Sequence, residues 1–460
     1  MRRFSLFLAL VIIYNISAMA QNIGENELQE IRKSYNSNNP YDRAVSNAVQ
    51  NNSIKDLAKN RFNETRFDGE FKYKVDVKGI TNQKQSGRCW MFTGLNVLRP
   101  IVAKNLNTDN FYFSTNYLYF WDIFEKSNLF LERIIATADK KIDDREVVHF
   151  LKSPVNDGGV WNSLANVVTK YGAVPKDVMP ETHSSENTSF MVRLINRKLR
   201  EDAIDLRQAV ADKKDARKMK ISMLGDIYRI LAINLGEPPT EFQWRYTTKD
   251  GKLTDYKKYT PKSFFKEVLP DFDQNNYVLF MNDPTREYYK LYEIEMDRNI
   301  QEGKNWKYIN LPSDEIKKYA MESIKNNDAM YASCDVGKFL EKESGILDPE
   351  NFDYESLFNV KFGMDKKERI LTRESGSSHG MALVAVDVDK NEKPVKWMFE
   401  NSWGSSYGHN GYLIFSDKWF DEYMFRVVVL KKYVDKKILD ILKQEPIMLP
   451  AWDPMFLEDK

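Results

Sequence analysis

The chain has 460 residues, of which 42% are apolar and 13% are aromatic, a composition that can fill a large core. It carries 68 lysines and arginines against 67 aspartates and glutamates, and this near-zero net charge argues against nucleic-acid binding as its main function. The composition also excludes a disordered or fibrous chain, and two cysteines are too few for a disulfide framework.

The first 20 residues have the pattern of a secretory signal peptide. Residues 1–3 are Met-Arg-Arg, residues 4–13 are apolar, and residues 18–20 read Ala-Met-Ala, which has the small-x-small form of a cleavage site. A membrane span needs about 20 apolar residues, and this run is too short. We therefore expect export to the periplasm or the extracellular space, with no stable membrane anchor.

Cys89 lies in the segment QSGRCWMF, where small and polar residues precede it, unlike the surroundings of a typical buried thiol. Apolar residues then recur at the spacing of one helical face, at Phe92, Leu95, Leu98 and Val102. A helix is thus expected to begin at Cys89, where the helix dipole helps a thiol to lose its proton. Pro100 predicts a kink or an interruption after about three turns.

Two glutamines precede Cys89 in a turn-rich stretch. A nucleophile that attacks a carbonyl group leaves negative charge on the oxygen, and a side-chain amide can stabilise that charge. Gln83 is the expected donor, together with the backbone N–H of Cys89. Gln85 is the alternative.

The chain offers four histidines as a base for the thiol. His379 directly precedes the apolar stretch 381–388, which is typical of a buried strand. His149 lies in an amphipathic, helix-like stretch. His183 lies in a loop-like stretch, and His409 fits a hairpin turn. His379 is therefore the expected base.

Asn401 opens a second turn-and-strand pattern 22 residues after His379. If the two strands pair, the Asn401 side-chain oxygen can accept a hydrogen bond from the imidazole ring and fix its orientation. Trp403 would then cover that hydrogen bond from water. The alternative, that His379 and Asn401 have unrelated roles, is disfavoured by the presence of Gln83 and Cys89 earlier in the chain.

Cys334 follows an apolar stretch and is expected to be a buried thiol at the end of a strand. Whether it can pair with Cys89 depends on their proximity in the fold. No metal site is expected, because the histidines are few and Cys334 has no partner at ligand spacing.

These motifs resemble, in their full order, the signature of papain-type cysteine peptidases: Gln83, Cys89-Trp90, His379-Gly380 and the run NSWG at 401–404. The resemblance implies that Cys89 is the nucleophile, His379 the general base and acid, Asn401 the orienting group and Gln83 the oxyanion donor. It assigns supporting roles to Trp90 and Trp403.

Two departures from papain narrow the assignment. Ser86 stands where papain-like enzymes commonly carry a disulfide-bonded cysteine. From Cys89 to His379 the chain spans 290 residues, against the roughly 130–150 that are usual. A large insertion is therefore expected, as in the bleomycin hydrolase or aminopeptidase C branch of the family, which the chain resembles from about residue 22 onward. The stretches that carry this resemblance are 156–182, 235–239, 282–284, 334–338 and 445–455.

The resemblance implies an α+β, papain-like, two-lobed fold, with a helical half, a β-barrel-like half and a large, mostly helical insertion. Residues 192–235 read on their own as charged amphipathic helices. The expected division is a signal peptide (1–20), a nucleophile-helix lobe (21–160), the insertion (161–365), a barrel-like lobe with His379 and Asn401 (366–435) and a C-terminal arm (436–460). Relatives assemble as hexameric barrels, so a homohexamer is expected.

The implied activity is that of a thiol-dependent aminopeptidase that acts on peptides with a free N-terminus and needs no cofactor. In relatives the C-terminal arm enters the cleft, so the carboxylate of Lys460 is expected to hold the substrate's amino group. The charged ending Glu458-Asp459-Lys460 and the export signal both depart from the usual pattern of this branch. The alternatives are an endopeptidase or amide hydrolase with an open cleft, and a non-catalytic peptide-binding protein.

Overall fold

The computed structural model describes residues 22–63, 66–453 and 455. The expected signal peptide and the C-terminal carboxylate of Lys460 lie outside these residues. Two compact units are present, one of residues up to 59 with 353–361 and one of residues 60–352 with 362–460. Their bounds differ from those of the segments expected from the sequence. Within the described residues, no helix combines the length and the apolar character of a membrane span.

The smaller unit consists of short helices, α1 (Glu25–Arg32), α2 (Pro40–Asn51), α3 (Ile54–Ala58) and α13 (Tyr354–Phe358). The Asn39 side chain accepts a hydrogen bond from the Tyr41 N–H at 2.9 Å, and Pro40 is the first residue of α2. Both features favour the start of a helix. The Asp353 N–H donates to the Ala58 carbonyl at 2.7 Å and so joins α13 to α3.

The larger unit is built on one mixed sheet, and a separate hairpin pairs β2 (Phe242–Trp244) with β3 (Lys257–Tyr259). The central strands of the sheet are buried along most of their length. Its strands among the described residues are, in spatial order, β14 (Ile447–Leu449), β5 (Lys290–Ile294), β6 (Lys307–Asn310), β4 (Tyr277–Met281), β13 (Met424–Leu430), β7 (Met330–Cys334), β10 (His379–Val388), β11 (Pro394–Glu400), β12 (Tyr412–Ser416), β9 (Ile346–Leu347) and β8 (Leu340–Glu341), with β1 (Tyr73–Lys74) paired to β10.

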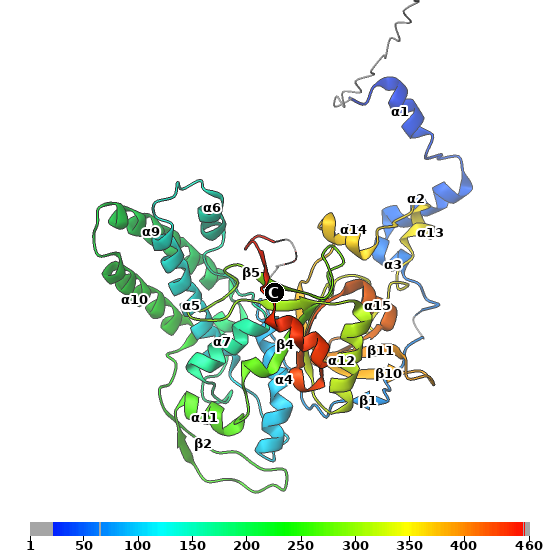
Figure 1. The fold of residues 1–460 in the computed structure, drawn as a ribbon. Helices are drawn as coiled ribbons and strands as arrows, with labels where there is room; N and C mark the ends of the chain where they lie inside the picture. The colour runs from blue at the N-terminus through cyan, green and yellow to red at the C-terminus, as the bar shows by residue number, and fades with distance from the viewer. Residues whose placement is uncertain (1–21, 64–65, 454, 456–460) are drawn as a thin grey trace, which may run out of the picture. The chain divides into compact units, whose positions relative to one another are not determined.

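Helices of the larger unit pack against this sheet and against one another, and Figure 1 shows α5, α9 and α10 side by side. Helix α4, which begins at Cys89, contacts β10, β7 and α7. The helix bounds are α4 (Cys89–Asn105), α5 (Thr115–Ala136), α6 (Arg145–Lys152), α7 (Trp161–Tyr171), α8 (His183–Glu186), α9 (Ser189–Ala211), α10 (Ala216–Leu235), α11 (Pro261–Val268), α12 (Ser313–Lys325), α14 (Lys366–Leu371), α15 (Asp417–Tyr423) and α16 (Lys436–Leu439).

Helices α9 and α10 cover the stretch that was expected to form charged amphipathic helices. Met191, Ile195 and Leu199 recur every four residues along α9 and are buried, whereas Arg193 and Arg197 between them are exposed. This pattern places one apolar face against the core and the charges in solvent. The prediction of amphipathic helices in this stretch is confirmed.

The stretch 161–365 supplies more than helices. It contains α7 to α12, and it also provides β4, β5, β6 and β7, of which β4 and β7 flank β13 in the sheet. Residues between Cys89 and His379 in the chain thus take part in the sheet that carries His379.

Helix α4 continues through Pro100 to Asn105, so the proline does not interrupt it. Leu98 and Val102, on either side of the proline, are fully buried. Their burial on both sides outweighs the loss of one backbone hydrogen bond, because tertiary packing overrides local propensity.

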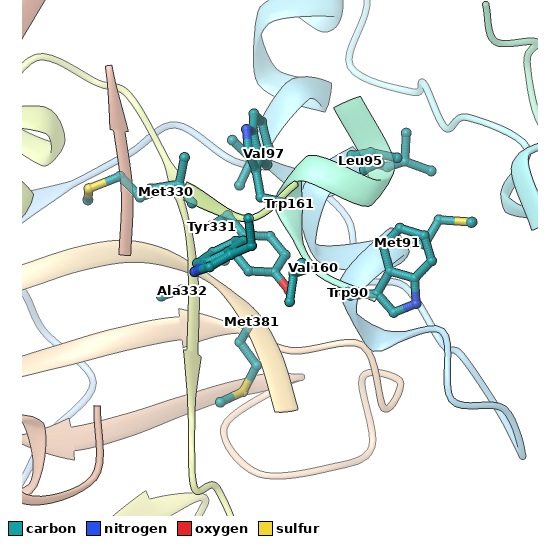
Figure 2. Close-up of a cluster of buried hydrophobic side chains, with 14 of the residues drawn as sticks. Trp90, Met91, Leu95, Val97, Val160, Trp161, Met330, Tyr331, Ala332 and Met381 are labelled. Atoms are coloured by element: carbon teal, nitrogen blue, oxygen red, sulfur yellow. The ribbon is translucent and has the colours of Figure 1, made fainter. Parts of the chain in front are cut away.

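The core beneath the start of α4 joins α4, α7, β7 and β10. Figure 2 shows Trp90 and Met91 of α4 near Trp161 of α7 and Tyr331 of β7, and all four side chains are buried. The rings of Trp161 and Tyr331 meet edge to face, with centroids 6.1 Å apart. This cluster holds the N-terminal end of α4 against the sheet.

Gly159 has no room for a methyl group, because a Cβ there would lie 2.6–2.9 Å from three ring atoms of Trp90. We expect Gly159→Ala to lower the free energy of unfolding by about 1–3 kcal/mol, since the buried ring must shift. Thermal unfolding followed by circular dichroism would measure the effect. Gly225→Ala in α10 is the matched control. A Cβ there meets nothing within 4 Å, and alanine should raise helix stability by about 0.5–1 kcal/mol. Unchanged stability of the Gly159 variant would contradict this account.

Candidate active site

Cys89 is the first residue of α4, with Arg88 at the N-cap, so the expected helix start is confirmed. The residue is fully buried, and its Sγ accepts a hydrogen bond from the Gly380 N–H at 3.5 Å. N–H groups in the first turn of a helix lack partners within the helix and favour negative charge. The fold therefore places the thiol where a thiolate is stabilised.

An ion pair between buried Arg88 and half-buried Glu181 holds the residue that precedes Cys89. Arg88 Nη1 lies 2.9 Å from Glu181 Oε2, and the guanidinium lies 5.2 Å from the ring centroids of Phe92 and Tyr119. Burial acts to raise the pKa of Glu181, but the charge of Arg88 and neighbouring hydroxyl groups outweigh it and hold the pKa below its usual range. Glu181 thus stays ionised at neutral pH, and Arg88 keeps its partner.

Trp90, expected as a supporting residue, donates from its indole Nε1 to the Asp157 carbonyl at 2.6 Å. The Asp157 carboxylate accepts hydrogen bonds from the Gly87 N–H at 3.1 Å and the Tyr119 hydroxyl at 2.6 Å. Asp157 therefore fixes the turn that leads into α4. Asp157 was not predicted as a site residue, because its stretch NDGG contributed only to the family resemblance.

His379 is the first residue of β10, and its Nε2 lies 2.9 Å from Asn401 Oδ1. Both residues are buried. Asn401 directly follows β11, which pairs antiparallel with β10, so the strands meet as the sequence predicts. The contact engages Nε2 and leaves Nδ1 as the ring nitrogen that can exchange a proton with the thiol. His379 directly precedes Gly380, whose N–H contacts Cys89.

Trp403 lies against the His379 ring, with ring centroids 4.7 Å apart and planes inclined by 33°. Tyr407 packs edge-on against the Trp403 ring, with ring centroids 4.8 Å apart. The tryptophan is therefore close enough to shield the bond between His379 and Asn401 from water.

Gln83 is buried, and both ends of its amide are held. Its Nε2 donates to the Ser86 carbonyl at 2.7 Å, and its Oε1 accepts from the Ser402 hydroxyl at 2.7 Å. Ser402 was not predicted as a site residue, although it lies inside the motif NSWG. The alternative donor, Gln85, is exposed, which favours Gln83.

The remaining histidines lie elsewhere in the fold. His149 is in α6, His409 forms a bridge with Tyr412, and His183 begins the short helix α8 instead of lying in a loop. A capping box explains this difference, since the Thr182 hydroxyl accepts a hydrogen bond from the Ser185 N–H at 3.1 Å.

Cys334 is buried at the end of β7, as expected, and is paired in register with His379. Its Sγ lies 4.0 Å from the His379 carbonyl oxygen. Neither Cys334 nor Cys89 forms a disulfide bond. The described part of the chain also brings together no group of three or more His, Cys, Asp or Glu residues that could hold a metal ion.

A cavity of about 440 Å³ is lined among others by His149, Asn156, Ala451 and the two serines that precede His379, Ser377 and Ser378. Burial, followed by the charges of nearby cations, lowers the pKa of His149, so this wall of the cavity carries a neutral imidazole at neutral pH. Cys89, His379, Asn401 and Gln83 are not among the residues that line it.

The C-terminal segment is seated at this cavity. Strand β14 pairs in parallel with β5, and Trp452 stacks on the Arg145 guanidinium at 4.2 Å. The Met455 carbonyl accepts a hydrogen bond from Arg426 Nη2 at 3.0 Å, and Asp453 forms an ion pair with Arg286. These contacts bring the last described residues close to the cavity that Ala451 lines.

Comparison with known proteins gives consistent matches over nearly the whole chain. Residues 22–456 match the model of the peptidase C1-like family. Aminopeptidase C of Listeria monocytogenes is 39% identical over 419 residues, which is 91% of this chain and 95% of that protein. Bleomycin hydrolase of Mus musculus is 42% identical over 398 residues, covering 84% of this chain and 88% of that protein.

Among solved structures, PepW from Lactobacillus rhamnosis HN001 superimposes with a TM-score of 0.92 at 38% identity, over 96% of this chain and all of that one. The fold is thus the expected α+β, papain-like, two-lobed fold with a large insertion. By its sequence and its fold, the chain belongs to the peptidase C1-like family, in the branch of bleomycin hydrolase and aminopeptidase C.

Proposed function

We propose that the chain is a thiol-dependent aminopeptidase that removes N-terminal residues from peptides. The observation that carries the proposal is the 2.9 Å contact between His379 Nε2 and Asn401 Oδ1, next to the Gly380 N–H that donates to Cys89 Sγ. A thiol, an imidazole and an orienting amide are the components of nucleophilic acyl transfer. Relatives similar over most of the chain are named aminopeptidase C and bleomycin hydrolase.

In the proposed mechanism the Cys89 thiolate attacks the carbonyl carbon of the first peptide bond, and the electron pair of the C=O bond moves to the oxygen. Gln83 Nε2 and the Cys89 N–H donate hydrogen bonds to this oxyanion. The C–N bond breaks as the His379 imidazolium gives its proton to the leaving amine. His379 then deprotonates a water molecule, which attacks the thioester and releases the N-terminal residue and the thiolate.

The C-terminal segment would restrict cleavage to the first peptide bond of the substrate. Trp452 and Asp453 are held by Arg145 and Arg286, and Ala451 next to them lines the cavity. We assign to the carboxylate of Lys460 the capture of the substrate's amino group. A positively charged amine paired with this carboxylate would set the distance from the substrate's N-terminus to Cys89.

A homohexamer is part of the proposal. In its support, the larger unit exposes apolar side chains on its α9 and α10 helices, where Phe190, Ile221 and Ile233 are 61%, 66% and 71% exposed. Covering these side chains with another subunit would remove apolar surface from water, which favours association. Light scattering coupled to size exclusion would measure the mass, and a monomer at micromolar concentration would contradict the hexamer.

Export is also proposed, on the basis of the basic, apolar and small-residue pattern of residues 1–20. N-terminal sequencing of the protein from a periplasmic or culture fraction should read from Gln21. Recovery of an uncleaved chain from the cytosol alone would contradict export.

Cleavage should require both a free substrate amine and the Cys89 thiol. We expect the wild type, with a reductant present, to cleave an aminoacyl fluorogenic substrate and to leave its N-acetylated twin intact. Cys89→Ala should abolish the cleavage, because the proposed acyl-enzyme forms on the Cys89 thiol. Equal cleavage of both substrates would indicate an open endopeptidase cleft, and no cleavage of either would favour a binding protein.

The control for this selectivity is a chain that ends at Met455. It moves the terminal carboxylate from Lys460 back to Met455, whose carbonyl oxygen is bound by Arg426, and keeps the contacts of Trp452 and Asp453. Cleavage of the acetylated substrate should appear in this variant while Cys89 remains essential. Unchanged selectivity would show that another group captures the amine.

Removal of the oxyanion donor should lower turnover without loss of the thiol. We expect Gln83→Ala to reduce kcat on the order of 10² to 10³-fold, because the oxyanion loses one hydrogen bond in a buried site. The matched control is Gln85→Ala, an exposed glutamine two residues away, which should keep kcat near the wild-type value. Steady-state kinetics would measure both, and the reverse order of effects would show that the donor is misassigned.

A further inference from the structure

A buried ion pair joins the nucleophile helix to the strand that ends before Asn401. Arg99 of α4 donates from Nη2 to Glu400 Oε1 of β11 at 2.6 Å. The two residues are 4% and 1% exposed. Arg99 lies on the same helix as Cys89, and Glu400 directly precedes Asn401. The pair therefore links two of the segments that carry the reaction.

The same guanidinium also holds a third segment. Arg99 Nη2 donates to the Gly79 carbonyl at 3.1 Å, and Nη1 donates to Asn96 Oδ1 at 2.8 Å. Asn96 in turn donates to the Thr81 hydroxyl at 3.0 Å. Residues 79–81 lead into Gln83, so Arg99 contacts the path to the oxyanion donor as well.

This third segment also pairs directly with the residues after Asn401. The Gly404 N–H donates to the Thr81 carbonyl at 3.0 Å, and the Gln83 N–H donates to the Ser402 carbonyl at 2.8 Å. The segments of Cys89, Gln83 and Asn401 thus form one closed network with Arg99 at its centre.

Stability alone does not account for so deeply buried a pair. Burial raises the pKa of Glu400 to about 7, although Arg99 acts to lower it. Glu400 Oε2 has no hydrogen-bond partner among the described residues. Apolar residues of similar volume are often as stabilising as a buried ion pair. An ion pair can instead fix the position of the two segments that carry its charges.

We propose that Arg99 and Glu400 are positioning residues that fix the segments of Cys89, Gln83 and Asn401 relative to one another for acyl transfer. This inference rests on the proposed aminopeptidase function. Both side chains are buried, and neither lines the cavity that Ser377 and Ser378 border, so we assign them a role through the segments that they hold. A displacement of about 1 Å at a reacting group can lower the rate on the order of 100-fold.

The test replaces both charges, in the variant Arg99→Met with Glu400→Leu, so that no unpaired charge remains buried. The thiols that react with iodoacetamide are counted first, and kcat is expressed per reactive thiol. We expect kcat to fall on the order of 10- to 100-fold, while KM stays within about 3-fold and the apparent Tm within a few degrees of wild type. A kcat per thiol within about 2-fold of wild type would overturn the inference.

The matched control makes the same substitutions, Lys198→Met with Asp202→Leu, in the ion pair of α9, whose atoms lie 2.9 Å apart. This variant should keep the wild-type kcat per thiol, and an equal loss in it would also overturn the inference. Wild-type turnover, measured first on the free-amine substrate, separates failure of the proposed function from failure of the inference.

If the double variant does not fold, Arg99→Lys provides the second measurement. Lysine keeps the charge but lacks the planar fork that reaches Gly79, Asn96 and Glu400 together. A lowered kcat per thiol at unchanged KM would support the positioning role, and a wild-type kcat would overturn it.

Discussion

The register of β10 against β11 is the constraint on which the geometry of the site depends. Ala382 pairs with Glu400, so this register brings His379, at the start of β10, and Asn401, directly after β11, to the same end of the strand pair. The contacts follow this register, with Asn401 bonded to the His379 ring and Trp403 stacked on it. A slip of one residue would turn one set of side chains to the other face of the sheet. The imidazole would then lose its orientation.

The turn before α4 shows how the fold keeps polar groups buried next to a reactive thiol. Asp157 accepts hydrogen bonds from Gly87 and Tyr119, and Arg88 pairs with Glu181 beneath the helix start. A buried donor or acceptor without a partner costs about 1–3 kcal/mol. Movement of Cys89 away from the sheet would strain several of these contacts at once, so they hold the N-terminal end of α4 in place.

Local patterns in the sequence were sufficient for the elements that carry the reaction. The helix that begins at Cys89 follows from apolar periodicity, and the strand that begins at His379 follows from an unbroken apolar run, which indicates a strand buried on both faces. The roles of Asp157 and Ser402 were not predictable from the sequence, since they consist of hydrogen bonds to residues distant in the chain. The passage of α4 through Pro100 was also not predictable, because it depends on the burial of neighbouring side chains and not on local propensity.

Directional polar contacts supply what apolar packing around α4 does not. The core of Trp90, Trp161 and Tyr331 holds the helix against the sheet, but apolar contacts have no preferred direction and tolerate small shifts. A guanidinium is planar and presents its donors in a fixed fork, so the acceptors around Arg99 are satisfied in one arrangement. A shift of α4 that apolar side chains could follow would leave the Glu400 carboxylate buried without its partner. The network thus turns a small displacement of the nucleophile helix into an energetic penalty, and it does so at the residue adjacent to Asn401.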